Sequence, residues 1–170
     1  LVMVHTFDAT PARVFAAWAE REAKAKWFGG PSGQWKPLER DMDFRVGGSE
    51  RARGQWASGR TTDFQATYHD IVPDRRIVYS YAMHVDGKKI SVSLATIEFE
   101  PSGKGTKLIL TEQGAFLDGY DDAGSRERPR LAQVAAHHAA VGARPLDERV
   151  GAAQNRAHRR RQPLRHAETH

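Results

Sequence analysis

The spacing of apolar residues changes along the chain and divides it into segments of different secondary structure. The run from Val2 to Phe7 is β-branched and aromatic, which predicts a strand. Val14, Phe15 and Trp18 then follow at positions that share one face of a helix. Apolar and polar residues next alternate over a long region, and near the end of the chain the apolar residues recur at helical spacing again.

The first helical segment is predicted to form two short helices. Thr10 offers a side-chain oxygen at a cap position, and Pro11 suits the first helical turn. Residues 20–26 continue with strong helix formers and stop before Gly29 and Gly30, which favour helix termination. We therefore expect two short helices, or one bent helix, directly after the first strand.

The alternating region predicts six further strands. Its runs are separated by glycine, proline and aspartate pairs that favour tight turns. The expected strands lie at residues 35–46, 52–58, 62–72, 77–85, 89–99 and 106–115. Six consecutive strands joined in this way form an antiparallel meander. With the strand predicted at Val2 to Phe7 they make about seven strands, so the chain is predicted to be an α+β fold.

A change in composition near Arg128 predicts the domain organisation. Residues 1–128 form the expected domain body, and residues 129–142 an expected helix with Leu131, Val134 and Val141 on one side. Residues 143–170 form an expected basic tail, with room for a second short helix before a disordered end. The expected helix therefore carries only a thin apolar stripe.

Charge and composition narrow the classes of partner. The net charge is +5, and residues 129–170 account for all of it with eight arginines against three acidic residues. This tail lacks aromatic residues for base stacking, so we do not expect nucleic-acid binding. No apolar stretch approaches the roughly 20 residues of a membrane span, so we expect no membrane partner and a cytoplasmic location. The chain has no cysteine, which excludes disulfides and thiolate metal sites.

Four segments carry a resemblance to a known family. They are FDATPARVFAAWAEREAKAKWFGG (7–30), DFRVGG (43–48), YHDIVPDRRIVYSY (68–81) and TKLILTEQGAF (106–116). Together they resemble the START-like (SRPBCC) superfamily, in its branch of homologues of the activator of the heat-shock-protein ATPase. The resemblance implies a helix-grip fold, in which a sheet curves around a long C-terminal helix and leaves a ligand cavity between them. Because the helix expected at 129–142 carries only a thin apolar stripe, we expect a wider or partly exposed cavity, or closure by a second copy in a homodimer.

The C-terminal segment departs from this family pattern. The family usually has a Gly-Trp followed by a helix with bulky leucines, whereas residues 126–149 are rich in arginine, alanine and histidine. We hypothesise that a shifted reading frame produced the sequence beyond about Arg128. Resequencing of the coding DNA tests this, and a clean frame with matching relatives would contradict it.

The predicted ligand-binding residues are mostly aromatic, with polar tips on several of them. Buried tyrosine hydroxyls and indole nitrogens need partners, which a ligand or water can supply, although each ring alone could equally fill a core. The predicted set is Trp18, Trp27, Phe28, Phe44, Arg53, Trp56, Phe64, Tyr68, Tyr79, Tyr81 and Phe99.

Three functions fit these features. The leading one is the binding of a small hydrophobic or amphipathic molecule in the cavity. The alternatives, which the resemblance implies, are an enzyme like a polyketide cyclase or aromatase, and a module associated with a chaperone ATPase. The usual sequence motifs of catalysis and of metal or nucleotide binding are absent, so we expect no catalytic residues, no metal and no cofactor.

Overall fold

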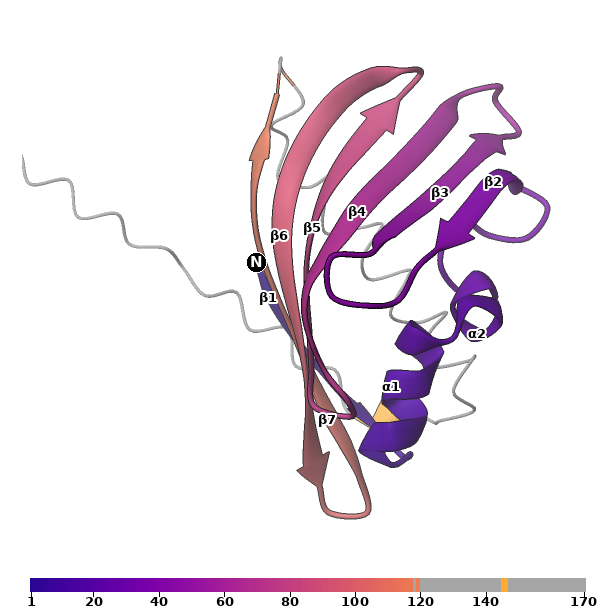
Figure 1. Ribbon diagram of the computed structural model, residues 1–170. Coiled ribbons are helices and arrows are strands. Elements are labelled where there is room, and N and C mark those ends of the chain that lie inside the picture. The colour runs from indigo at the N-terminus through magenta and orange to yellow at the C-terminus, as the bar shows by residue number, and fades with distance from the viewer. Residues whose placement is uncertain (118, 120–144, 147–170) are drawn as a thin grey trace, which may run out of the picture.

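The computed structural model describes residues 1–117, 119 and 145–146. The predicted helix at 129–142 lies outside the described residues. So do the tail at 143–170 and the segment of the frameshift hypothesis, except for residues 145–146. Within them the chain forms one curved antiparallel sheet with two helices on one side (Figure 1). None of the described helices is long and apolar enough to cross a membrane.

The sheet has the order β2-β3-β4-β5-β6-β7-β1-β8. Its strands are β1 (Val2–Phe7), β2 (Trp35–Met42), β3 (Ser49–Trp56), β4 (Thr61–Val72), β5 (Arg76–Val85), β6 (Lys88–Ser102), β7 (Gly105–Phe116) and β8 (Pro145–Leu146). The predicted seven antiparallel strands are thus present as β1 to β7. The sequence analysis did not anticipate β8, which pairs with the end of β1.

The two short helices predicted after the first strand are also present. They are α1 (Pro11–Ala19) and α2 (Arg21–Ala25), separated by the extended backbone of Glu20. The predicted role of Thr10 is only partly right, because its side chain makes no capping hydrogen bond and its backbone oxygen accepts from the amide of Val14. The turn at Glu20 lets α2 pack separately from α1.

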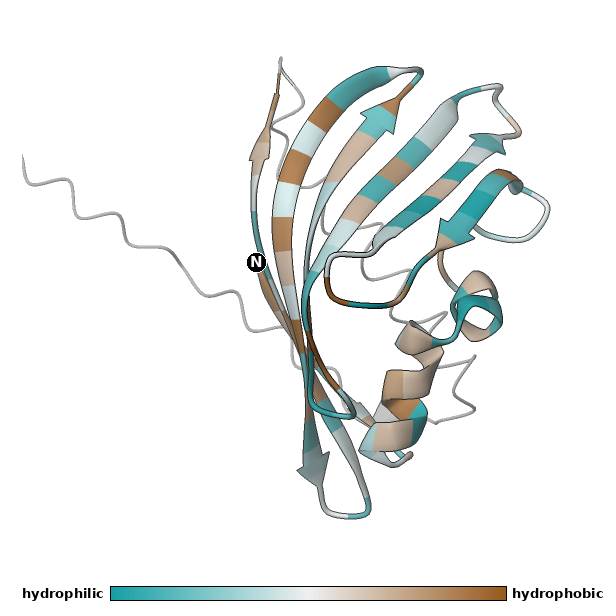
Figure 2. Ribbon diagram, viewed as in Figure 1, coloured by the Kyte–Doolittle hydropathy of each residue, from teal (hydrophilic) through white to brown (hydrophobic). Residues whose placement is uncertain are grey.

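Alternation along the strands gives the sheet an inner and an outer face. On β6 the residues from Ser91 to Phe99 at odd positions are buried, while Val92 and Leu94 between them are 44% and 43% exposed. The corresponding bands of hydropathy along β6 are visible in Figure 2. The helices pack on the inner face (Figure 1), so the buried positions point toward them.

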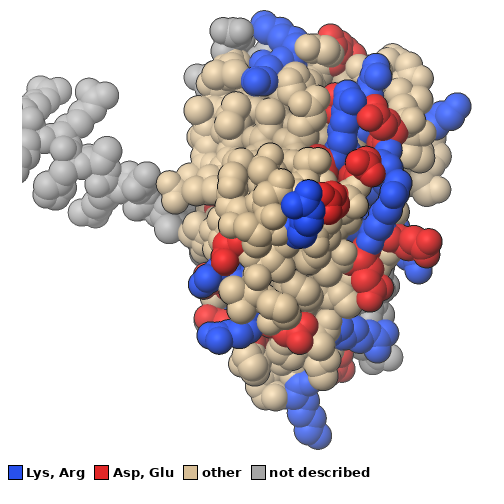
Figure 3. All heavy atoms as spheres, viewed as in Figure 1, with Lys and Arg blue, Asp and Glu red and all other residues tan. Residues whose placement is uncertain are grey.

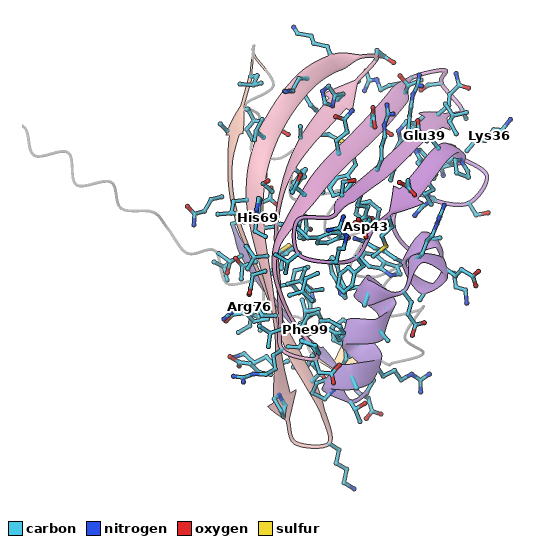
Figure 4. The ribbon with its side chains drawn as sticks, in the orientation of Figure 1. Lys36, Glu39, Asp43, His69, Arg76 and Phe99 are labelled. Atoms are coloured by element: carbon cyan, nitrogen blue, oxygen red, sulfur yellow. The ribbon has the colours of Figure 1, made fainter. Side chains whose placement is uncertain are left out.

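The core lies between α1 and the inner face. Phe15 of α1 meets Phe99 of β6 with ring centroids 5.4 Å apart, and Val14 is fully buried beside them. Figure 4 shows Phe99 between the sheet and α1, whereas His69 and Arg76 lie on the outer side. The apolar face predicted for α1 therefore anchors this helix to the sheet.

Candidate functional site

Aromatic side chains cover the inner face in a connected group. Phe64 of β4 lies at its centre, with ring centroids 4.8 Å from Phe28 and 5.0 Å from Tyr81. Tyr79 is 6.2 Å from Tyr68 and 6.0 Å from Tyr81. These rings come from three separate segments of the chain, and the fold brings them together.

Further predicted residues border this group. Trp27 stacks edge-on against Trp18 at 4.6 Å and against Phe28 at 5.7 Å. Phe44, in the loop after β2, lies 5.0 Å from Tyr68. Phe99 is farther along the sheet and packs against α1, as described above.

Two predicted residues lie apart from the inner group. Arg53 is exposed on the outer face of β3, where charged side chains of β2, β3 and β4 alternate in sign, as in the band seen in Figure 3. Across these strands, Arg51 of β3 binds Asp63 of β4 at 2.8 Å and Glu39 of β2 at 3.0 Å. Trp56 is half-buried at the end of β3, opposite Trp35.

A buried lysine and a buried glutamate form the polar centre of the site. Lys24 of α2 and Glu50 of β3 are 2% and 5% exposed, and Lys24 Nζ lies 2.5 Å from Glu50 Oε2. The hydroxyl of Tyr68 donates to the same carboxylate oxygen, and Lys24 Nζ is 3.5 Å from that hydroxyl. A helix and two strands thus share one charged contact in the interior.

Aromatic rings surround the ammonium group of Lys24. Its Nζ lies 4.9 Å from the centroid of Phe28, 5.6 Å from Trp18, and 5.9 Å from both Tyr68 and Tyr79. These distances allow cation–π attraction. Desolvation by burial nevertheless lowers the pKa of Lys24 below its ordinary value, although the adjacent Glu50 acts in the opposite direction.

The carboxylate also affects its tyrosine partner. Burial, and then the charge and hydrogen bond of Glu50, raise the pKa of Tyr68 far above its ordinary value. Tyr68 therefore stays protonated and serves as a hydrogen-bond donor at any physiological pH. A second contact of this kind lies on β5 and β7, where the hydroxyl of Tyr81 donates to Glu112 at 2.8 Å and Glu112 is 3% exposed.

A small hollow reaches the lysine from the surface. It has a volume of about 10 Å³ and is lined by Arg21, Lys24, Arg40, Asp41, Met42 and Glu50. That is about the space one water molecule needs. Burial lowers the pKa of Arg40, whose guanidinium donates to the backbone oxygen of Phe28 and so holds the end of α2 against β2.

Sequence reasoning missed Lys24 and Glu50. One local signal existed for the lysine, because Phe28 follows it by four residues and Trp27 by three, which is the spacing of one helical face. Glu50 carries no comparable signal, since it alternates with arginines in a strand of mixed polarity. Only the pairing of distant segments reveals the cluster.

Comparisons with known proteins agree with this architecture. A solved structure from Rhizobium leguminosarum is 40% identical, covers 84% of this chain and 93% of its own, and has a TM-score of 0.79. A structure from Rhizobium loti is also 40% identical, covers 82% and 94%, and has a TM-score of 0.75. An AHSA1 protein from Silicibacter pomeroyi shares the fold. It is 18% identical, the match covers 84% of this chain and 96% of its own, and the TM-score is 0.68. No curated protein matches the chain.

The family model agrees with the resemblance seen in the sequence. The model described as "Activator of Hsp90 ATPase homolog 1-like protein" matches residues 8–135, which is more than half of the chain and includes both helices and strands β2 to β7. On this match, the chain belongs to the Activator of Hsp90 ATPase homolog 1-like family.

Proposed function

We propose that this domain binds a small hydrophobic or amphipathic molecule against its inner aromatic face. The observation that carries the proposal is the connected group of rings around Phe64, which includes tyrosine hydroxyls held by buried carboxylates. Apolar and aromatic walls with a few placed polar groups are the usual composition of small-molecule sites. The domain body at 1–128 would supply this wall, and the helix proposed at 129–142 would cover it.

The polar groups suggest how an amphipathic ligand would be oriented. Tyr68 and Tyr81 stand on β4 and β5, and each donates its hydroxyl to a carboxylate. A ligand lying across Phe64 would place its apolar body on the rings and its polar end near one of these pairs. The rings supply binding free energy through burial, at about 25 cal/mol per Å² of apolar surface, and the hydroxyls supply orientation.

Native mass spectrometry of the purified protein tests the proposal. A panel of medium-chain fatty acids and two-ring aromatics should give one-to-one complexes that quench the fluorescence of the buried tryptophans. Phe64→Leu should weaken binding about tenfold, because it removes a ring at the centre of the group. Leu94→Ala, on the outer face, is the matched control and should bind like the wild type. The proposal would be contradicted if no member of the panel bound.

A second candidate function is an enzyme of the cyclase or aromatase kind. It is favoured by the contact of the Lys24 amine with the Glu50 carboxylate, two groups able to move protons, beside the hydrogen-bond donor Tyr68. Turnover of a polyketide-like substrate that falls in Glu50→Gln but not in the exposed control Glu39→Gln would support it. Equal turnover in both variants would count against it.

A further inference from the structure

Lys24 is unlike the other lysines of the chain. All seven lie within the described residues, and Lys24 alone is buried. Lys26 follows it by two residues and is exposed, so the two amines share a segment but not an environment. Lys24 Nζ is also held between a carboxylate at 2.5 Å and a phenol at 3.5 Å.

The amine has a route to the surface. The lining of the hollow beside Lys24 includes Arg21 and Asp41, whose side chains are 57% and 70% exposed and lie 3.8 Å apart. An exposed ion pair of this kind contributes little to stability. Its side chains can therefore move aside and admit a small molecule toward Nζ.

We propose that Lys24 captures carbonyl compounds, small aldehydes or ketones, as an imine at the base of this hollow. This activity goes beyond the proposed function, because it forms a covalent bond that reversible binding on the aromatic face does not require. The nucleophile is Lys24 Nζ, the proton acceptor is Glu50, and Tyr68 is the neighbouring donor.

The chemical step balances with these groups. The ammonium passes one proton to Glu50, and the nitrogen lone pair attacks the carbonyl carbon while the oxygen receives that proton. A second proton moves from the nitrogen to the oxygen, with Glu50 as the relay. The carbon–oxygen bond then breaks, and one water leaves. An ammonium and a carbonyl thus give an iminium and water, with no oxidation or reduction.

The groups around Lys24 Nζ stabilise the iminium product as well as the ammonium from which it forms. The iminium keeps the single positive charge of the ammonium, so the surrounding rings and Glu50 hold it as they held the lysine. Burial also lowers the pKa of Lys24, which increases the fraction of free amine near neutral pH. A desolvated lysine beside a proton acceptor is the usual arrangement of an imine-forming residue.

Reductive trapping tests this proposal on the wild-type protein. The folded chain is treated at pH 7 with acetaldehyde and cyanoborohydride, and each lysine is followed by peptide mapping for the addition of one ethyl group. Lys24 should be labelled faster than Lys26, because Glu50 lies 2.5 Å from its Nζ and accepts the proton that the amine must lose before it attacks. In urea the two rates should become equal.

Variants separate chemistry from packing. Glu50→Gln should slow the labelling of Lys24 and leave Lys26 unchanged, and Lys26→Met should leave Lys24 unchanged. The proposal would be overturned if Lys24 in the folded wild type were labelled no faster than Lys26. This comparison of the two labelling rates uses the wild-type protein alone, so it does not depend on whether a variant folds. Carbonyl-free aromatic ligands test the proposed function separately, because they bind without an imine.

Discussion

The ion pair between Lys24 and Glu50 makes a strong prediction about stability. Both side chains are buried and their charged atoms lie 2.5 Å apart. Lys24→Met keeps a similar shape but leaves the carboxylate of Glu50 with Tyr68 as its remaining donor among the contacts described. Removing one partner of a buried pair costs about 3–5 kcal/mol. That loss is a large part of the roughly 5–15 kcal/mol that holds a domain together.

Urea unfolding followed by tryptophan fluorescence measures this loss. Thermal unfolding should show it as a decrease of roughly 6–20 °C in Tm, since each kcal/mol corresponds to about 2–4 °C in a chain of this size. Lys26→Met, which changes an exposed lysine on the same segment, should stay within about 0.5 kcal/mol of the wild type.

A double variant checks the physical reason. Adding Glu50→Gln to Lys24→Met should restore much of the lost stability, because the neutral amide still accepts from Tyr68 and neither charge of the pair remains buried. A cost below about 1 kcal/mol for Lys24→Met alone, or no recovery in the double variant, would refute the argument that an uncompensated buried charge causes the loss.

Three further predictions concern the sheet. Gly54→Ala would place a Cβ 2.0 Å from the ring of Trp35, so it should displace that ring, cost about 1–3 kcal/mol in urea unfolding and shift the tryptophan emission. Burial opposes ionisation of Asp63, but hydrogen bonds and charge from Arg51 hold the pKa of this carboxyl below its ordinary 3.8 in the folded protein. The ionised carboxylate therefore contributes its full stability to the fold above pH 3.8, and this contribution disappears as the pH falls through the lower pKa of the folded state. Asp63→Asn should therefore lose less stability than the wild type during acid titration. Phe64→Ala should cost about 3–5 kcal/mol in urea unfolding, since it empties the centre of the ring group.

Each of these has a result that would contradict it. Unchanged emission and stability in Gly54→Ala would mean that Trp35 does not cover this glycine. Parallel acid titrations of the wild type and Asp63→Asn would mean that the carboxylate contributes no pH-dependent stability. A loss below about 1 kcal/mol in Phe64→Ala would mean that the ring is not part of a packed core.

Much of the fold was predictable from local patterns. The strand predicted at 77–85 is Arg76–Val85 in the structure, and the one predicted at 62–72 is Thr61–Val72. Turns were also visible, because the Asp86-Gly87 pair that joins β5 to β6 takes positive φ at both residues, as tight hairpins require. Such features depend on neighbouring residues, so a single sequence contains them.

The direction of each strand face was harder to predict. Strand β3 reads SERARGQW, and neither alternating half of it is apolar. Its inner half is Glu50, Ala52 and Gly54 because Lys24 pairs with the first and the ring of Trp35 lies over the last. Its outer half contains Arg53, which sequence reasoning grouped with the ligand-binding residues.

The sequence alone determined the order of α1, α2 and strands β1 to β7, the apolar face of α1 and the aromatic inventory of the inner face, since each follows from spacing along neighbouring residues. The tertiary structure alone decided that a lysine and a glutamate meet in the interior. The hydrogen bonds from Lys24 and Tyr68 to Glu50 span 26 and 18 positions of the chain. The physical reason is that a charged side chain becomes buried only when distant segments supply its partner, and periodicity carries no information about that partner.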